Sequence, residues 1–277
     1  MPSRGPPVRA ASPGDPMRLA AQIHDGPDDR PPLLVAHGLF GAAQNWRSLG
    51  KRMAKKRRVI AVDMRNHGDS PRDADAGYPA MAADLAETIR AEAGGRADVL
   101  GHSMGGKAAM ALALSAPETL GRLIVADIAP VAYDHAHGDY IAAMRTLDLD
   151  RVARRSDADP LLAPAIPEPP LRAFILQNLV IENGRARWRP NLDALEAGME
   201  ALLSFPDALP REAWDGPALF LRGGASDYVA DRHRDAIAAR FPAARIETIE
   251  GAGHWLHAEK PEPFVAAVER FLDGADA

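Results

Sequence analysis

Short apolar runs alternate with helical patterns along most of the chain. The apolar runs predict buried strands over residues 33–37, 59–64, 98–101 and 123–128. Hydrophobic residues at helical spacing predict helices over 45–56, 78–93 and 104–114. Strands that are apolar on both faces are typical of a parallel sheet covered by helices on each side. Because crossovers between parallel strands are right-handed, the pattern predicts an α/β fold with a mostly parallel, doubly wound sheet.

This alternation stops after residue 131. Residues 134 to about 205 show no convincing buried strand but hold helical patterns at 140–147, 171–179 and 192–203. We therefore predict a helical insertion that forms a lid over the sheet. Strands and helices then resume over 218–221, 231–240, 246–249 and 262–272. The predicted organisation is a disordered Pro-rich arm over 1–16, a core over 17–133 and 206–277, and a helical lid over 134–205.

Composition narrows the classes of function. The chain has 277 residues, of which 47% are hydrophobic, enough for one compact domain with a large core. It contains no Cys, which excludes disulfides and thiolate chemistry and fits a reducing compartment, so we expect a cytoplasmic protein. The formal net charge of −5 gives no reason to expect a nucleic-acid partner. No apolar run reaches the roughly 18 residues of a membrane span.

A serine stands in the pattern G-x-S-x-G at residues 101–105, between a predicted strand and a predicted helix. A tight strand-to-helix turn presents such a serine hydroxyl at the edge of the sheet. The amide of Met104, at the start of the helix, can stabilise an oxyanion. We therefore predict Ser103 to be a catalytic nucleophile.

Two further groups are expected around this serine. The glycine-rich stretch HGLFG at 37–41 follows the first buried strand and can bring the amide of Leu39 or Phe40 to the oxyanion. His254 follows the last predicted strand, where this chain order places the general base. His257, three residues later, is expected to have a structural role.

Two aspartates compete for the role of the acid that orients His254. Asp227 follows the strand at 218–221, and Asp127 follows the strand at 123–126. Either carboxylate could stabilise the charged imidazole, so the spacing alone leaves both open.

The motifs together give the chain a clear resemblance over residues 17–273. It resembles the α/β-hydrolase superfamily and, within it, the YbfF-like esterases and their mitochondrial animal relatives. The matching stretches are HGLFG with Asn45 and Trp46, VDMRNHGDSP at 62–71, GHSMGGK at 101–107, VADIAPV at 125–131 and GHWLHAEKP at 253–261.

This resemblance implies the α/β-hydrolase fold and an esterase or acyl-CoA thioesterase activity, with Ser103 and His254 in the catalytic triad. It also favours Asp127 as the acid, because in that subfamily a serine, here Ser226, occupies the usual acid position. The chain departs from the pattern by placing Asp227 beside that serine, which keeps Asp227 as an alternative.

The expected reaction is two-step acyl transfer on a small-molecule ester or thioester, without cofactor or metal. Predicted substrate contacts are Phe174, Leu179, Met199, Leu203 and Trp255. A phosphate-binding loop is disfavoured at 101–107, because Ala108 stands where Ser or Thr should hold Mg²⁺. A binuclear metal motif at 135–140 is disfavoured, because it ends in Tyr140 rather than His.

Two other functions stay compatible with these residues. One is a different serine-dependent reaction on the same fold, such as carbon–carbon bond hydrolysis. The other is a ligand receptor that keeps the triad but turns over negligibly. The sequence leaves the oligomeric state open.

Overall fold

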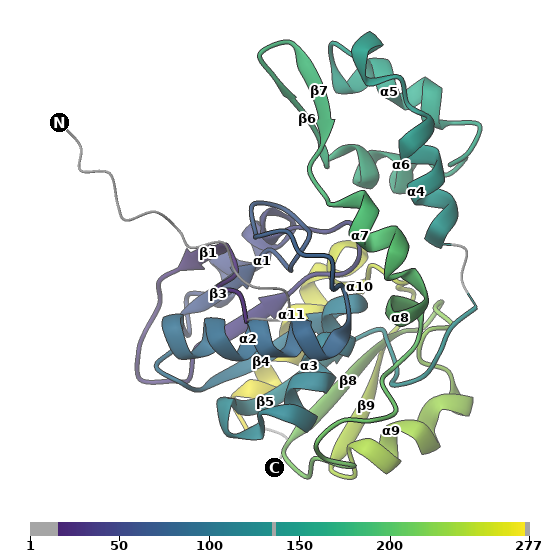
Figure 1. Cartoon of the computed structure of the whole chain (residues 1–277). Helices are drawn as coiled ribbons and strands as arrows, with labels where there is room; N and C mark the ends of the chain where they lie inside the picture. The colour runs from purple at the N-terminus through teal and green to yellow at the C-terminus, as the bar shows by residue number, and fades with distance from the viewer. Residues whose placement is uncertain (1–15, 135–136, 275–277) are drawn as a thin grey trace, which may run out of the picture.

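A seven-stranded sheet forms the centre of the molecule in the computed structural model, which describes residues 16–134 and 137–274 (Figure 1). The strand order is β1-β3-β2-β4-β5-β8-β9, and every neighbouring pair is parallel except β1 with β3. The strands are β1 (Ala21–His24), β2 (Leu33–Ala36), β3 (Val59–Val62), β4 (Ala97–His102), β5 (Leu120–Ala126), β8 (Ala218–Gly223) and β9 (Ala244–Ile249). The predicted mostly parallel, doubly wound sheet is thereby confirmed.

Helices cover both faces of the sheet. One face packs against α2 (Tyr78–Glu92), α3 (Met104–Ser115) and α9 (Arg234–Arg240). The other face packs against α1 (Arg47–Met53), α10 (Leu256–Glu259) and α11 (Pro261–Leu272). Alternate residues of each strand pack into the hydrophobic cores on opposite faces of the sheet. In β2, Leu34 packs in the core on the side of α2 and α3, and Leu33 packs in the core on the side of α1 and α11. This two-sided burial explains the continuous apolar runs.

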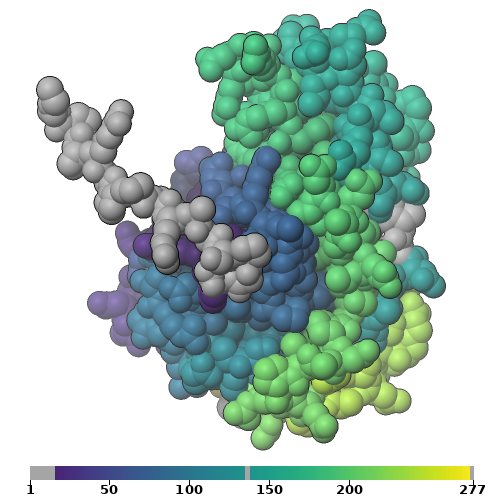
Figure 2. All heavy atoms as spheres, viewed as in Figure 1, coloured from purple at the N-terminus to yellow at the C-terminus, as the bar shows by residue number. Residues whose placement is uncertain are grey.

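The chain between β5 and β8 forms a separate lobe, which we call the inserted segment (residues 137–203). Figure 2 shows it in teal and green above the rest of the molecule. Its elements are α4 (His137–Thr146), α5 (Arg155–Leu162), α6 (Pro169–Leu176), β6 (Leu179–Glu182), β7 (Arg185–Trp188), α7 (Leu192–Ala197) and α8 (Met199–Leu203). Short 3-10 helices occur in the body and in the inserted segment. They are η1 (Ala43–Trp46), η2 (Pro117–Thr119) and η4 (Asp231–His233) in the body, and η3 (Leu149–Arg151) in the inserted segment.

The expectation of an insertion without strands is wrong. The helix predicted over 171–179 ends at Leu176, and β6 and β7 then pair as an antiparallel hairpin. Asn183 and Gly184 link the two strands with φ values of 53° and 73°, the left-handed backbone that a two-residue Asn-Gly hairpin turn requires. The helix predicted over 192–203 is divided at Gly198, between α7 and α8.

Some predictions fall on residues that the structure does not describe. The arm predicted at residues 1–16 lies outside it except for Pro16, and the rejected metal motif begins at residues 135–136, which are also outside. Within the described ranges, no helix has the length and apolar character needed to cross a membrane.

The turn from β4 into α3 packs closely against the end of β2. A Cβ atom added at Gly105 would lie 2.4 Å from the Ala36 carbonyl oxygen at the end of β2. A Cβ added at Gly101 would lie 2.2 Å from the carbonyl oxygen of Gly105. Both distances are far below contact, so only glycine lets the first turn of α3 approach β2 this closely.

We predict that Gly105→Ala lowers the free energy of unfolding by about 1–3 kcal/mol, because backbone atoms must move to admit the new methyl group. Urea denaturation followed by circular dichroism measures this change. Gly138→Ala is the control, because no atom of residues 16–134 or 137–274 lies within 4 Å of a Cβ added there in α4. Equal stability of the Gly105 variant and the wild type would contradict the steric argument.

Candidate active site

Ser103 sits at the turn between β4 and α3 with an unusual backbone. Its φ of 51° and ψ of −119° place a non-glycine residue in a strained region. Its amide donates to the Ala126 carbonyl of the neighbouring strand at 3.0 Å, which holds the turn in place. Met104 begins α3, and the first amides of a helix have no partner inside the helix. The predicted nucleophile and a predicted oxyanion donor are therefore consecutive residues.

His254 is hydrogen-bonded to Asp127. The imidazole Nδ1 lies 2.8 Å from Asp127 Oδ2. Asp127 follows β5, is fully buried and has a φ of 53°. Its carboxylate also accepts a hydrogen bond from the Gly223 amide at 2.9 Å and another from the Ser226 hydroxyl. A carboxylate held in this way fixes the imidazole with its proton on Nδ1, which leaves Nε2 as the basic nitrogen.

Asp227 does not take part in this contact. It lies on an exposed loop after β8, and its backbone carbonyl is 3.5 Å from an Arg232 guanidinium nitrogen. The preceding residue, Ser226, points its hydroxyl at Asp127 instead. Of the two aspartates left open by the spacing, the structure brings Asp127 to the histidine.

The loop after β2 holds the second group of predicted oxyanion donors. It is closed by a hydrogen bond from the Gly41 amide to the Gly38 carbonyl at 2.9 Å. The Phe40 amide donates to His67 Nε2 at 3.2 Å, so it is already engaged. Of the two predicted donors, Leu39 and Phe40, the amide of Leu39 is therefore the candidate hydrogen-bond donor to the oxyanion.

Two buried histidines support this loop by accepting backbone hydrogen bonds. His37 Nδ1 is 2.8 Å from the Gly38 carbonyl, and its Nε2 accepts the Met64 amide at 2.9 Å. His67 Nδ1 is 2.9 Å from the Arg65 carbonyl. Burial lowers the pKa of His37 to about 4 and that of His67 to about 3. Both rings are therefore neutral, with one nitrogen donating and the other accepting.

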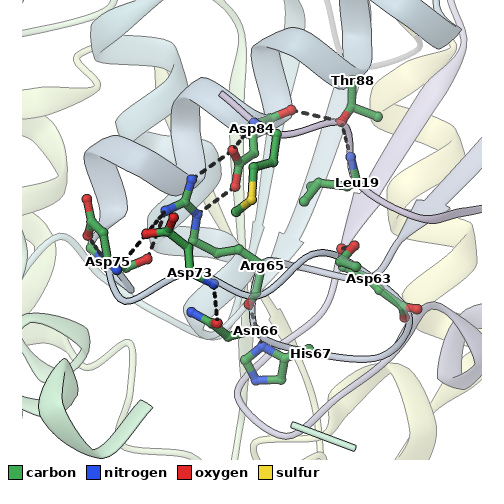
Figure 3. A network of polar contacts seen from close by, with 12 residues as sticks. Leu19, Asp63, Arg65, Asn66, His67, Asp73, Asp75, Asp84 and Thr88 are labelled. Atoms are coloured by element: carbon green, nitrogen blue, oxygen red, sulfur yellow. Dashed lines mark hydrogen bonds and ion pairs between the residues drawn. The ribbon is translucent and has the colours of Figure 1, made fainter. Parts of the chain in front are cut away.

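A network of buried ion pairs and hydrogen bonds holds the loop that carries His67 (Figure 3). Arg65 binds both carboxylate oxygens of Asp84, at 2.6 and 2.8 Å, and donates to the Asp75 carbonyl at 2.8 Å. Asn66 accepts the Asp73 amide at 2.9 Å. The stretch VDMRNHGDSP thus forms a rigid support between α2 and the glycine-rich loop.

A cavity of about 230 Å³ opens beside Ser103 and His254, between the body and the inserted segment. Phe174 and Trp255, both predicted substrate contacts, line it, and their ring centroids are 5.9 Å apart. Tyr228 stacks on the His254 imidazole with 3.9 Å between the centroids. Other residues in the wall include Trp46, Tyr140, Leu171 and His257.

A smaller cavity of about 30 Å³ also reaches Ser103 and is lined by Leu203. At its side, the buried ammonium of Lys107 donates to the Leu203 and Ser204 carbonyls at 2.8 and 2.6 Å. Burial lowers the pKa of this lysine to about 7. The other predicted contacts, Leu179 and Met199, are absent from the lining of both cavities. Leu179 lies in the hydrophobic core, and Met199 is partly buried and packs against that core.

His257 packs within the cavity wall. Its ring stacks on Trp46 with 4.4 Å between centroids, and its buried Nδ1 has no hydrogen-bond partner in the part of the chain that the structure describes. Burial lowers its pKa to about 3. This environment agrees with the structural role expected from the sequence.

Comparison with known proteins identifies the family. A model of the alpha/beta hydrolase family matches residues 33–267. The chain belongs to the α/β-hydrolase family. It is 42% identical over 265 residues to the mouse (Mus musculus) protein named sn-1-specific diacylglycerol lipase ABHD11, covering 93% of this chain and 86% of the relative.

Two further relatives strengthen this assignment to the α/β hydrolases. The chain is 38% identical to esterase YbfF of Escherichia coli, over 93% of this chain and 99% of that protein. A solved structure described as a marine microorganism esterase superposes with a TM-score of 0.87 at 36% identity, covering 92% of this chain and 99% of that one. The resemblance proposed from the motifs, including the YbfF-like subfamily, is confirmed.

The sequence did not single out every residue that shapes the site of this α/β hydrolase. His37 and His67 belong to the motifs HGLFG and VDMRNHGDSP, but nothing in those motifs shows that the two rings accept backbone amides. Asn178, which donates to the Phe40 carbonyl at 2.7 Å, and Tyr140, which lines the larger cavity, come from the inserted segment. The sequence marks Tyr140 only as the residue that breaks the rejected metal motif, and it does not mark Asn178. These residues became visible only through contacts between distant parts of the chain.

The neutral state of His67 makes stability depend on pH. Its pKa is below the usual value of 6.5, so the folded protein binds fewer protons than the unfolded chain. The contribution of neutral His67 to the free energy of unfolding is complete above pH 6.5 and is lost as the pH falls toward 3. From pH 6.5 to 5, this amounts to about 2 kcal/mol, at about 1.4 kcal/mol per pH unit.

We therefore predict that His67→Gln, which keeps an acceptor but cannot be protonated, flattens the pH dependence. Between pH 6.5 and 5, the wild type should lose about 2 kcal/mol more unfolding free energy than this variant. Urea denaturation at several pH values measures the difference. Parallel curves for the two proteins would contradict the proposed neutral acceptor.

Proposed function

We propose that this protein is a carboxylic ester hydrolase that works through an acyl-enzyme on Ser103. The observation that carries the proposal is the 2.8 Å hydrogen bond between His254 Nδ1 and buried Asp127, formed beside the strained turn of Ser103. The names of the relatives, a diacylglycerol lipase and two esterases, support the same class of reaction.

In the proposed first step, His254 Nε2 removes the proton from the Ser103 hydroxyl as its oxygen attacks the ester carbonyl. The amides of Met104 and Leu39 donate to the negative oxygen of the tetrahedral intermediate. Asp127 stabilises the imidazolium that forms, and the imidazolium then protonates the departing alcohol. In the second step, His254 activates a water molecule that releases the acid and frees the serine.

The cavity supports an ester with an apolar acyl or alcohol group. Its wall combines Phe174, Trp255, Leu171 and Tyr228, while the polar groups gather at Ser103. The inserted segment supplies part of this wall, so we propose that it acts as a lid over the substrate. The proposed reaction needs neither cofactor nor metal, because every bond change is carried by Ser103, His254 and water.

Thioester hydrolysis is part of the same proposal. A thioester carbonyl reacts through the same tetrahedral intermediate as an ester carbonyl. We also keep the cytoplasm as the proposed compartment, which the absence of cysteine supports. A screen of acyl esters and acyl-CoA thioesters of graded chain length would identify the preferred substrate.

The nucleophile can be tested directly. We predict that Ser103→Ala abolishes hydrolysis of a p-nitrophenyl ester and labelling by a fluorophosphonate probe, because the probe bonds to the activated hydroxyl. Its circular dichroism spectrum should match that of the wild type, since alanine removes one oxygen atom. Labelling that persists in this variant would place the nucleophile elsewhere.

The acid can be tested with a matched pair of variants. We predict that Asp127→Asn lowers kcat strongly, toward the roughly 10⁴-fold loss seen for this change in serine proteases. Asn would present the wrong hydrogen-bonding partner to the imidazole. Asp227→Asn should change kcat less than threefold, because that side chain is exposed. A reversed order would assign the role to Asp227.

A further inference from the structure

Phe40 holds a backbone conformation that aromatic residues rarely adopt. Its φ is 60°, in the left-handed region, while its side chain is buried. A non-glycine residue in this region costs about 1–3 kcal/mol and persists only where neighbouring groups hold it. Phe40 directly follows Leu39, whose amide is the proposed oxyanion donor. The backbone angles of Phe40 therefore matter for the shape of the site.

Hydrogen bonds hold the peptide groups on both sides of Phe40. The Phe40 amide donates to His67 Nε2 at 3.2 Å. On the side of its carbonyl, Asn178 Nδ2 donates at 2.7 Å. His67 belongs to the body of the protein, whereas Asn178 belongs to the inserted segment. The strained residue is thus fixed by one contact from each part of the molecule.

Asn178 is itself firmly placed. It lies between α6 and β6, and the whole residue is only 3% exposed. The backbone amide of Asn178 donates to the Ile175 carbonyl at 3.0 Å, and the backbone carbonyl of Asn178 accepts the Arg189 amide at 2.9 Å. The end of α6 and the end of the hairpin therefore both orient this side chain toward the glycine-rich loop.

We propose that Asn178 is a positioning residue for the oxyanion donors. Its hydrogen bond keeps Phe40 in the left-handed conformation and so keeps the Leu39 amide directed at the substrate oxygen. This inference rests on the proposed ester hydrolysis and adds a role for the inserted segment in the chemical step. Loss of the bond should affect the transition state more than the ground state, because the oxyanion exists only there.

Other contacts dock the inserted segment without touching Phe40. Gln177 accepts from Asn45 Nδ2 at 2.6 Å, and the Asn191 amide donates to the Asn66 carbonyl at 2.9 Å. Tyr78 donates to the Leu202 carbonyl at 2.6 Å. Removing the Asn178 bond therefore leaves the segment attached, and the effect on Phe40 can be measured separately.

Two variants of similar size and one control test the proposal. Asn178→Leu removes the donor, and Asn178→Asp replaces it with an acceptor that faces the Phe40 carbonyl. Gln177→Ala is the control, because this exposed neighbour makes a contact between the segment and the body that does not involve Phe40. For each variant, kcat and KM are measured with a p-nitrophenyl ester, together with Ki for a trifluoromethyl ketone, whose adduct with serine mimics the tetrahedral intermediate.

We expect Asn178→Leu to lower kcat by about tenfold or more, approaching the roughly 10²-fold loss that follows removal of an oxyanion donor. KM should change less than threefold, and Ki for the ketone should rise in parallel with the loss in kcat. Gln177→Ala should stay within twofold of the wild type in all three constants.

The aspartate variant adds a pH signature that a packing role would not give. A protonated carboxyl can donate to the Phe40 carbonyl, whereas an ionised one cannot, and burial raises the pKa of a carboxyl group. The ratio of Asn178→Asp activity to wild-type activity should therefore rise as the pH falls. Taking the ratio cancels the effects of pH that both proteins share.

The possible results separate this inference from the proposed function. A wild type without turnover would count against ester hydrolysis itself. An active wild type with an Asn178→Leu variant within twofold of its kcat would overturn the positioning role alone. A rise in KM at unchanged kcat and Ki would also overturn it, because the residue would then serve substrate binding only.

Discussion

The first turn of α3 lies so close to the end of β2 that the glycines at 101 and 105 have no space for a Cβ atom. This steric constraint fixes the distance between the serine turn and the loop that follows β2. Both elements lie at the carboxyl edge of the parallel sheet, where ligands bind in folds of this kind. The proposed oxyanion donors are backbone amides whose approach depends on this packing, and the side chain of Asn178 is proposed to position one of them.

The same edge of the sheet concentrates backbone strain. Ser103, Asp127 and Phe40 all have φ between 51° and 60°, and each lies just beyond a parallel strand. Every one of them is held by hydrogen bonds to a neighbouring strand or loop. Such strain costs stability locally and is offset by the large two-sided core.

Periodicity and the glycine motifs were enough to predict most of the fold and the roles proposed for Ser103 and His254. Strands buried on both faces give unmistakable apolar runs, whereas β1, an exposed antiparallel edge strand, has no such signal. The hairpin of β6 and β7 was missed although its Asn-Gly pair at 183–184 is a recognised turn signal. Reading that pair would have ended the preceding helix earlier.

Sequence spacing could not choose between Asp127 and Asp227, because the choice depends on the direction of two loops that both follow parallel strands. The resemblance favoured Asp127, and the geometry agrees with it. Neither spacing nor resemblance could show that the Phe40 amide is engaged. The bond between Asn178 and Phe40 joins residues 138 positions apart, a distance that no local pattern spans.

The carboxylate of Asp84 links the first described residues to the active-site loops. It binds Arg65 and also accepts the Met17 amide at 2.7 Å, while the Leu19 amide donates to the nearby Thr88 hydroxyl at 3.2 Å. The stretch at 17–19 is therefore connected, through Asp84 and Thr88, to the network that holds the loop carrying His67 (Figure 3). A protein shortened to begin after Leu19 would lose two buried donors, so the chain must extend at least to Met17 for this scaffold to form. Affinity tags are consequently best placed upstream of that point.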